Sequence, residues 1–262
     1  MKISEFGTEN NKTIMLLPGT SCTWEINFDM LLKPLSDKYH VICVNYTGFD
    51  GGTELFDTQT KETERIEKYI LEHFDGHLDA VYGSSMGGSF ASLMVQRGNV
   101  HIDHVFIGSS DLDQASPFVA RLETGIAGVF IKWMAKHPNK AMQKFGKLAD
   151  AKGMSIDDAA GQTGVSEDYT KHMLDGFVRV LGRTDTRSIK NQFYSDLVTR
   201  LNDNIRVQGT KIHVFHSEKM GEKYLKRYYK HYADPEIIPF PLGHEGWLCM
   251  PDKMIVVFDE RV

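Results

Sequence analysis

The sequence has few cysteines and no pattern that would put them to use. Its three cysteines, Cys22, Cys43 and Cys249, lie far apart, with no CxxC pair and no cluster of cysteines and histidines. Structural zinc sites and disulfide frameworks need such pairs at short, regular spacing. We therefore expect no metal centre and no disulfide framework, and this cysteine usage suits the reducing cytoplasm.

The sequence also lacks an excess of basic residues and any long apolar run. Thirty Lys and Arg stand against 35 Asp and Glu, which gives a formal charge of -5. Nucleic-acid binding depends on basic side chains that replace counterions along the phosphate backbone. No apolar run approaches the ~20 residues that span a bilayer, and residues 1–12 are mostly polar. We expect a cytoplasmic protein that binds neither nucleic acid nor a membrane.

Short apolar runs that alternate with amphipathic segments dominate the first part of the chain. The 262 residues are 41% hydrophobic and 25% charged, as in a soluble globular protein of one or two domains. Residues 14–17, 41–44, 80–82 and 104–107 are short buried-strand patterns, and residues 60–74 carry one apolar helical face. This alternation predicts an α/β protein with a mostly parallel sheet and helices on both faces.

A different pattern occupies residues 112–204, which are mostly helical and rich in Lys and Met. Strand patterns return at 212–215 and 236–240, with helices predicted over 221–231 and after Pro251. We interpret residues 112–204 as an inserted helical subdomain, and residues 1–111 and 205–262 as the core that carries the sheet. Four apolar side chains of the insertion are candidates for closing an acyl pocket: Phe118, Phe130, Trp133 and Met134.

A Gly-x-Ser-x-Gly motif lies between the third strand pattern and a helical segment. Gly83 and Gly87 flank Ser85, and a sharp turn from strand to helix at this position would expose the serine hydroxyl. The helix N-terminus that follows offers free amides to an oxyanion, and the Met86 amide is the specific candidate. The alternative is a phosphate-binding loop, but Ser85 stands where the second glycine of such a loop is required.

A second oxyanion donor is expected in the loop after the first strand pattern. Gly19 would let the backbone approach the nucleophile, which makes the Thr20 amide the candidate and Ser21 the alternative one residue later. A plain turn at this position is the competing interpretation.

A serine nucleophile also needs a base, and His244 has the right position in the chain. It follows the apolar strand pattern at 236–240 and comes after Ser85, which is the order of nucleophile and base in this kind of site. His244 and Glu245 do not begin a zinc-protease motif, because residue 248 is leucine.

These three motifs together resemble the α/β-hydrolases. The resemblance extends over the whole chain and implies an α/β-hydrolase fold, with a helical cap inserted after the strand at 104–107. It also implies a carboxylate that orients His244, but Met220 stands where the family commonly places this acid. Glu218, Glu222 and Asp111 are the candidates, and Asp113 is a weaker one. We favour Asp111, because it emerges directly from the strand next to the nucleophile strand.

The predicted activity is that of a serine hydrolase that cleaves a carboxylic ester or a related acyl compound without cofactor or metal. Ser85 would attack, His244 would transfer the proton, Asp111 or Glu218 would orient His244, and the amides of Thr20 and Met86 would bind the oxyanion. An acyltransferase, a carbon–carbon bond hydrolase and a non-catalytic ligand-binding homologue remain open as alternatives. The sequence identifies neither the substrate nor the oligomeric state.

Overall fold

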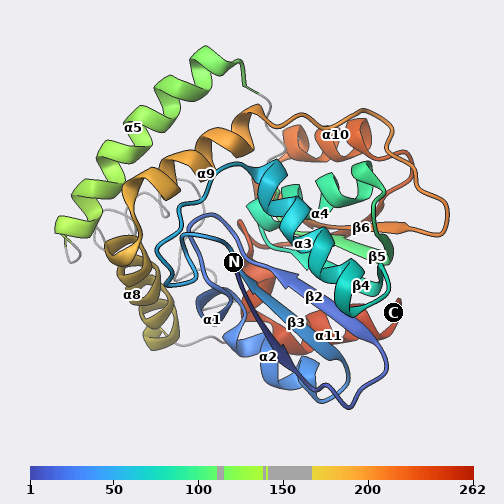
Figure 1. Ribbon diagram of the computed structural model, residues 1–262. Coiled ribbons are helices and arrows are strands. Elements are labelled where there is room, and N and C mark those ends of the chain that lie inside the picture. Colours follow the sequence, from blue (N-terminus) through green and yellow to red (C-terminus); the bar gives the residue numbers. More distant parts are fainter. Residues whose placement is uncertain (111–114, 138–139, 141–166) are drawn as a thin grey trace.

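The computed structural model describes residues 1–110, 115–137, 140 and 167–262 and is built around a seven-stranded sheet (Figure 1). The strands follow the order β1-β3-β2-β4-β5-β6-β7. Their bounds are β1 Lys2–Phe6, β2 Thr13–Leu17, β3 His40–Asn45, β4 His77–Gly83, β5 His101–Ile107, β6 Lys211–Ser217 and β7 Glu236–Phe240. Only β1 runs antiparallel to its neighbour, so the predicted mostly parallel sheet is confirmed.

The register of the central strands brings three chain segments together. Leu17 of β2 pairs with Gly83 of β4, and Gly83 pairs with Ile107 of β5. Because parallel strands end at the same edge of a sheet, the loops that follow these three residues converge there. This edge is where the topology places the predicted nucleophile and oxyanion loop.

Helices cover both faces of the sheet and bury a separate apolar core on each. On one face lie α3 (Gln59–His73), α4 (Met86–Arg97) and α10 (Glu222–His231). On the other lie α2 (Asp29–Ser36) and α11 (Pro251–Asp259), and the short helix α1 (Trp24–Asn27) precedes α2. Two short 3₁₀ helices, Glu218–Met220 and Gly246–Cys249, complete the connections of the C-terminal part.

Helix α3 agrees with the helix predicted over 60–74, and its cap and its apolar face explain why these residues form a helix. The hydroxyl of Thr58 accepts a hydrogen bond from the Lys61 amide at 3.2 Å and so caps the helix N-terminus. Ile66 and Ile70, one turn apart, are fully buried against the sheet.

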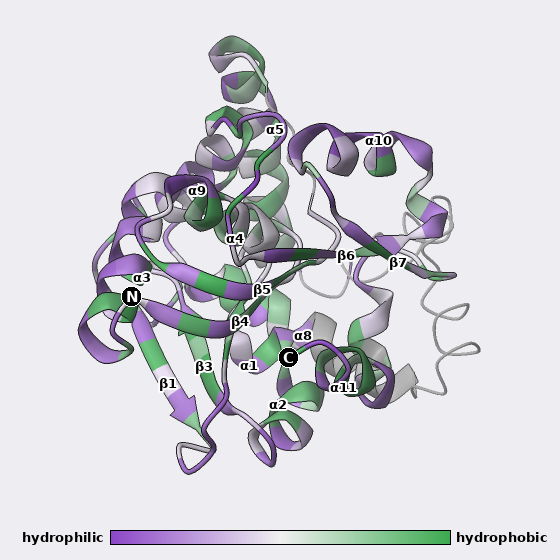
Figure 2. Cartoon of the chain, turned by 90° about the vertical axis from the view of Figure 1, so that its right-hand side faces the viewer, coloured by the Kyte–Doolittle hydropathy of each residue, from purple (hydrophilic) through white to green (hydrophobic). Residues whose placement is uncertain are grey.

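Strand β1 is the strand that the sequence did not indicate. Its residues are all exposed or partly buried, none is fully buried, and Figure 2 shows hydrophilic and hydrophobic residues mixed along it. An edge strand with one solvated face has too little apolar content to stand out from a polar terminus. Its pairing with β3 therefore becomes visible only in the fold.

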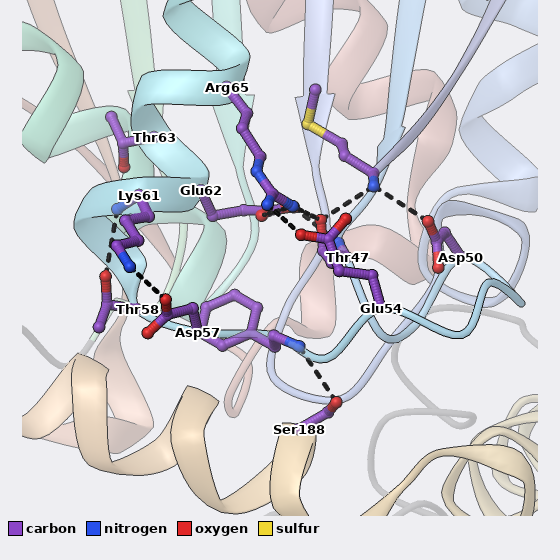
Figure 3. Close-up of polar contacts among 12 residues, drawn as sticks. Thr47, Asp50, Glu54, Asp57, Thr58, Lys61, Glu62, Thr63, Arg65 and Ser188 are labelled. Carbon is purple, nitrogen blue, oxygen red and sulfur yellow. Dashed lines mark hydrogen bonds and ion pairs between the residues drawn. The ribbon is translucent and has the colours of Figure 1, made fainter.

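The loop between β3 and α3 is fixed by polar contacts on both sides (Figure 3). The Thr47 amide donates to Glu62 of α3 at 2.6 Å, and the N-terminal ammonium donates to the Thr47 hydroxyl at 2.9 Å. The Phe56 amide donates to the Ser188 hydroxyl at 3.1 Å. Because these partners come from distant parts of the chain, the loop joins the sheet core to the helices beyond it.

Three helices from the predicted insertion lie together at one end of the molecule: α5 (Pro117–Lys136), α8 (Glu167–Arg183) and α9 (Thr186–Val198) (Figure 1). Helix α5 packs against both α8 and α9. Residues 111–114, 138–139 and 141–166 of this region lie outside the described residues. No helix among the residues that the structure describes is long and apolar enough to cross a membrane.

Candidate active site

Ser85 sits in a sharp turn between the end of β4 and the start of α4. Its backbone has φ of +50° and ψ of -118°, a conformation that non-glycine residues rarely adopt and that is concentrated at functional sites. A Cβ added at Gly87 would lie 2.0 Å from the Leu17 carbonyl oxygen, and one at Gly83 would lie 2.3 Å from the Gly87 backbone. Both glycines are therefore required for the backbone to pass this closely.

The hydroxyl of Ser85 faces the ring of His244. The two atoms Ser85 Oγ and His244 Nε2 are 3.2 Å apart, although 159 residues separate the two side chains in the sequence. His244 lies in the loop after β7 and is exposed. The structure thus brings together the predicted nucleophile and the predicted base.

The loop after β2 approaches the nucleophile as predicted, and Asn27 holds it there. A Cβ on Gly19 would lie 3.3 Å from the Ser85 Cβ, so a side chain at this position would crowd the serine. The Gly19 amide donates to Asn27 Oδ1 at 2.7 Å, while Asn27 Nδ2 donates to the Ser84 hydroxyl at 3.3 Å. A buried amide side chain thus connects the loop to the turn that carries Ser85.

The amides of Thr20 and Met86 both belong to residues that line the cavity beside Ser85. Within the described ranges no hydrogen bond uses either amide, so both are available to an oxyanion. The amide of Ser21, the alternative donor, is instead taken up by Gln192 Oε1 at 2.8 Å.

Glu245 is a site residue that the sequence analysis did not single out. Its Oε1 atom accepts hydrogen bonds from the amides of Ser85, at 2.6 Å, and Ser109, at 2.7 Å. Its Oε2 atom accepts from the Tyr82 hydroxyl at 2.9 Å, and the Trp247 indole donates to that hydroxyl at 2.8 Å. The signal available in the sequence was a single carboxylate between His244 and Trp247, in a segment without other charged residues.

The carboxylate that would orient His244 is not found among the described residues. Asp111 and Asp113 lie outside them. Glu218 is exposed in the turn after β6, and Glu222 is exposed and paired with Lys226 at 3.6 Å. In the part of the chain that the structure describes, the ring of His244 has no hydrogen bond to a carboxylate.

A cavity of about 270 Å³ opens beside Ser85 and His244. Helix α5 contributes Glu123, Thr124 and Ala127 to its wall, and helix α9 contributes Phe193, Asp196 and Leu197. The four apolar side chains that the sequence suggested for an acyl pocket do not line this cavity. Phe118 is 78% exposed, and Phe130, Trp133 and Met134 pack with the core on the α3 and α4 side of the sheet. The wall is therefore more polar than the sequence suggested.

Neither the thiol of Cys22 nor a metal site competes with Ser85 among the described residues. Burial raises the pKa of the Cys22 thiol to about 12, and the charge of Glu245 adds to this shift, so the thiol stays protonated at neutral pH. No group of three or more His, Cys, Asp or Glu side chains in the described ranges could hold a metal ion.

A comparison with curated proteins finds no match. Among solved structures, an alpha/beta hydrolase family protein from Desulfitobacterium hafniense has a TM-score of 0.72 and 14% identity, with 99% of each chain covered. MenH from S. aureus also has a TM-score of 0.72 and 14% identity, with 99% of this chain and 96% of that chain covered. An esterase from Exiguobacterium antarcticum has a TM-score of 0.67 and 13% identity, covering 98% of this chain and 93% of that one.

The TM-scores show that these three proteins share the fold of this chain, and identities this low leave the reaction open. The family model described as alpha/beta hydrolase fold matches residues 12–180, which is more than half of the sequence. That stretch contains the loop after β2, the turn around Ser85 and helix α5. The chain therefore belongs to the α/β-hydrolase family, as the motifs around Ser85 and His244 had indicated.

Proposed function

We propose that this protein is a serine hydrolase that cleaves a carboxylic ester or a related acyl compound through an acyl-enzyme intermediate. The observation that carries the proposal is the 3.2 Å contact between Ser85 Oγ and His244 Nε2, at a strained turn that faces a cavity. A serine hydroxyl becomes a useful nucleophile when a neutral imidazole stands within hydrogen-bond distance of it.

The reaction proceeds in two halves. In the first, Nε2 of His244 takes the hydroxyl proton while Oγ of Ser85 bonds to the carbonyl carbon, and the carbonyl oxygen becomes an oxyanion. The free amides of Thr20 and Met86 donate to that oxyanion. Collapse of the tetrahedral intermediate breaks the bond to the leaving group, which takes the proton from His244. In the second half, water attacks the acyl carbon while His244 takes its proton, the bond from that carbon to Ser85 Oγ breaks, His244 returns the proton to Oγ, and the acid product leaves.

We assign Asp111 as the carboxylate that orients His244. It follows the end of β5 after Ser110, and β5 pairs directly with the nucleophile strand β4. Glu218 is the second candidate, at the end of β6. A carboxylate on Nδ1 holds the imidazole in the tautomer that leaves Nε2 free to accept the serine proton.

We further propose that residues 112–204 form a cap over the site. Helices α5 and α9 of this segment supply six of the residues that line the cavity, whereas the nucleophile and base come from the sheet core. Substrate selection would then depend mainly on the inserted helices.

Labelling with a fluorophosphonate probe tests the proposal directly, because such probes react rapidly only with an activated serine. We expect labelling of the unaltered protein and its loss in Ser85→Ala and His244→Ala. Ser84→Ala is the comparison at the neighbouring serine: it removes the hydroxyl that accepts a hydrogen bond from Asn27 Nδ2, so labelling should become slower but should persist.

The rate of hydrolysis of short p-nitrophenyl esters should change in each variant in the same direction as the labelling rate. An unlabelled but folded protein would favour the non-catalytic, ligand-binding alternative. Labelling that persists in Ser85→Ala and disappears in Ser84→Ala would place the nucleophile one residue earlier. Acyl transfer to an added alcohol or thiol in preference to water would identify a transferase that uses the same residues.

A further inference from the structure

The loop after β2, residues 18–22, is held in place by hydrogen bonds to its backbone. The amides of Gly19, Ser21 and Cys22 donate to oxygen atoms of the protein at 2.7, 2.8 and 3.2 Å. Within the described ranges the Thr20 amide has no acceptor, and Thr20 lines the active-site cavity. The bonds of Gly19 and Ser21 fix the two peptide units on either side of the one that carries the Thr20 amide. The direction of this oxyanion donor therefore depends on the groups that hold its neighbours.

The group that holds the Ser21 amide is Gln192, which belongs to helix α9 of the insertion. Gln192 is fully buried and Ser21 is 1% exposed, so this hydrogen bond is shielded from water. The backbone of Ser21 has φ of +56°, which residues with a side chain seldom adopt. Such a conformation persists only where the surroundings hold it. An inserted helix thus fixes the residue that follows the proposed oxyanion donor Thr20.

Helix α9 is itself attached to the sheet core on both sides of Gln192. Ser188, Gln192 and Ser195 share one face of this helix, four and three residues apart, and all three are buried. The Ser188 hydroxyl accepts a hydrogen bond from the Phe56 amide at 3.1 Å (Figure 3). The Ser195 hydroxyl accepts one from the Gln59 amide at 2.5 Å. Gln192 therefore stands on a helix that is fixed to the core one turn before it and one turn after it.

We propose that Gln192 is a positioning residue for the oxyanion hole. By holding the Ser21 amide, it keeps the Thr20 amide directed at the oxyanion that forms when Ser85 attacks. This inference rests on the proposed serine hydrolase function. A hydrogen bond weakens steeply as its donor turns away from the acceptor, and an oxyanion donor acts mainly in the transition state. The insertion would then determine the rate of the chemical step as well as form part of the cavity wall.

The side-chain oxygen of Gln192 makes this contact, and its nitrogen is dispensable. The Nε2 atom is buried and has no hydrogen-bond partner in the part of the chain that the structure describes. Gln192→Glu keeps an acceptor oxygen at the same distance from the backbone, and burial favours the neutral form of that carboxyl group. Gln192→Met has a similar length and shape, but its sulfur atom accepts hydrogen bonds only weakly. These two variants separate the acceptor from the volume of the side chain.

Hydrolysis of p-nitrophenyl acetate provides the measurement. Complete loss of an oxyanion donor lowers kcat by about a hundredfold to a thousandfold, and a misdirected donor should lose part of that. We expect kcat to fall by about tenfold to a hundredfold in Gln192→Met, while KM stays within about threefold. Gln192→Glu should restore kcat to within about threefold of the unaltered protein. A loss that appeared in KM instead would assign Gln192 to substrate binding and overturn the inference.

Ser188→Ala is the matched control, because it removes an equivalent contact between α9 and the core without touching the loop at 18–22. It takes away the buried acceptor of the Phe56 amide, as Gln192→Met takes away that of the Ser21 amide. Denaturant unfolding should therefore show a similar loss of stability in both variants, whereas kcat should stay within about twofold in Ser188→Ala. An equal fall of kcat in the two would show that any loosening of α9 slows the reaction, which would overturn a specific role for Gln192.

The remaining outcomes separate failure of this inference from failure of the proposed function. A folded Gln192→Met with kcat within about threefold of the unaltered protein would overturn the inference and leave the hydrolase intact. A Gln192→Glu variant as slow as Gln192→Met would also overturn it, because the acceptor would then be present without effect. If Gln192→Met does not fold, Gln192→Asn withdraws the oxygen by one carbon and is judged by the same values. Failure of fluorophosphonate labelling in the unaltered protein would instead refute the function on which the inference rests.

Discussion

Replacing Glu245 by alanine should weaken the whole nucleophile turn, although this residue neither attacks nor transfers a proton in the proposed mechanism. Its carboxylate accepts the amides of Ser85 and Ser109 at 2.6 and 2.7 Å and the hydroxyl of Tyr82 at 2.9 Å. The strained backbone at Ser85 therefore depends on an acceptor that comes from the histidine loop. Glu245 itself has φ of +56°, so this loop is also held in an uncommon conformation.

The expected loss of stability in Glu245→Ala follows from the number of groups that would lose their hydrogen-bond partner. A buried donor left unsatisfied destabilises the fold by about 1–3 kcal/mol, and Glu245→Ala leaves two amides and a hydroxyl in this condition. Water entering the vacated space would recover part of the loss. We expect the free energy of unfolding to fall by about 3 kcal/mol or more, which lowers the melting temperature by roughly 6 °C in a chain of this size.

Glu245→Gln tests whether the turn depends on the hydrogen bonds that this side chain accepts or on its negative charge. The amide oxygen of glutamine can still accept from both backbone amides, and its nitrogen can donate to the Tyr82 oxygen. This variant should lose less than half as much stability as Glu245→Ala and should retain most of the fluorophosphonate labelling rate. Denaturant unfolding and labelling kinetics of both variants, with Glu72→Ala as the surface control, provide the measurement. A change below about 1 kcal/mol in Glu245→Ala would refute the argument that this carboxylate holds the turn together.

Four further outcomes are expected. Asp111→Asn should lower turnover by at least about a hundredfold at neutral pH and Glu218→Gln by less than about tenfold; the reverse order would move the orienting acid to β6. Gly87→Ala should fail to give folded protein, because the new Cβ would lie 2.0 Å from the Leu17 carbonyl oxygen. Gly125→Ala in α5 should be neutral or stabilising by up to about 1 kcal/mol, since no atom lies within 4 Å of its added Cβ. Burial lowers the pKa of His213 from 6.5 to about 4, so between these values the unfolded chain binds a proton that the folded chain lacks. Stability should therefore fall as the pH drops through this window, and a pH series of unfolding curves for His213→Gln should lose that part of the slope.

The sequence by itself determined the features that depend on residues close together in the chain. The apolar runs at 14–17, 41–44, 80–82 and 104–107 all became strands, because a buried parallel strand needs a short continuous apolar segment. The glycines on either side of Ser85 specified the sharp turn, since only a residue without a side chain fits beside the backbone of Leu17 and Gly87. Order along the chain was sufficient to single out His244 among eleven histidines.

The tertiary structure decided what depends on residues far apart in the chain. Glu245 meets the Ser85 amide across 160 positions, and no local pattern distinguishes its carboxylate from one that faces solvent. The polar wall of the cavity arises because α5 turns Thr124 inward and leaves Phe118 exposed, a choice between helix faces that is settled by packing against α9. Strand β1 exists because β3 offers it an edge. Local periodicity predicts which elements form, whereas the chemistry of the site is set by which side chains the packing brings within hydrogen-bond distance.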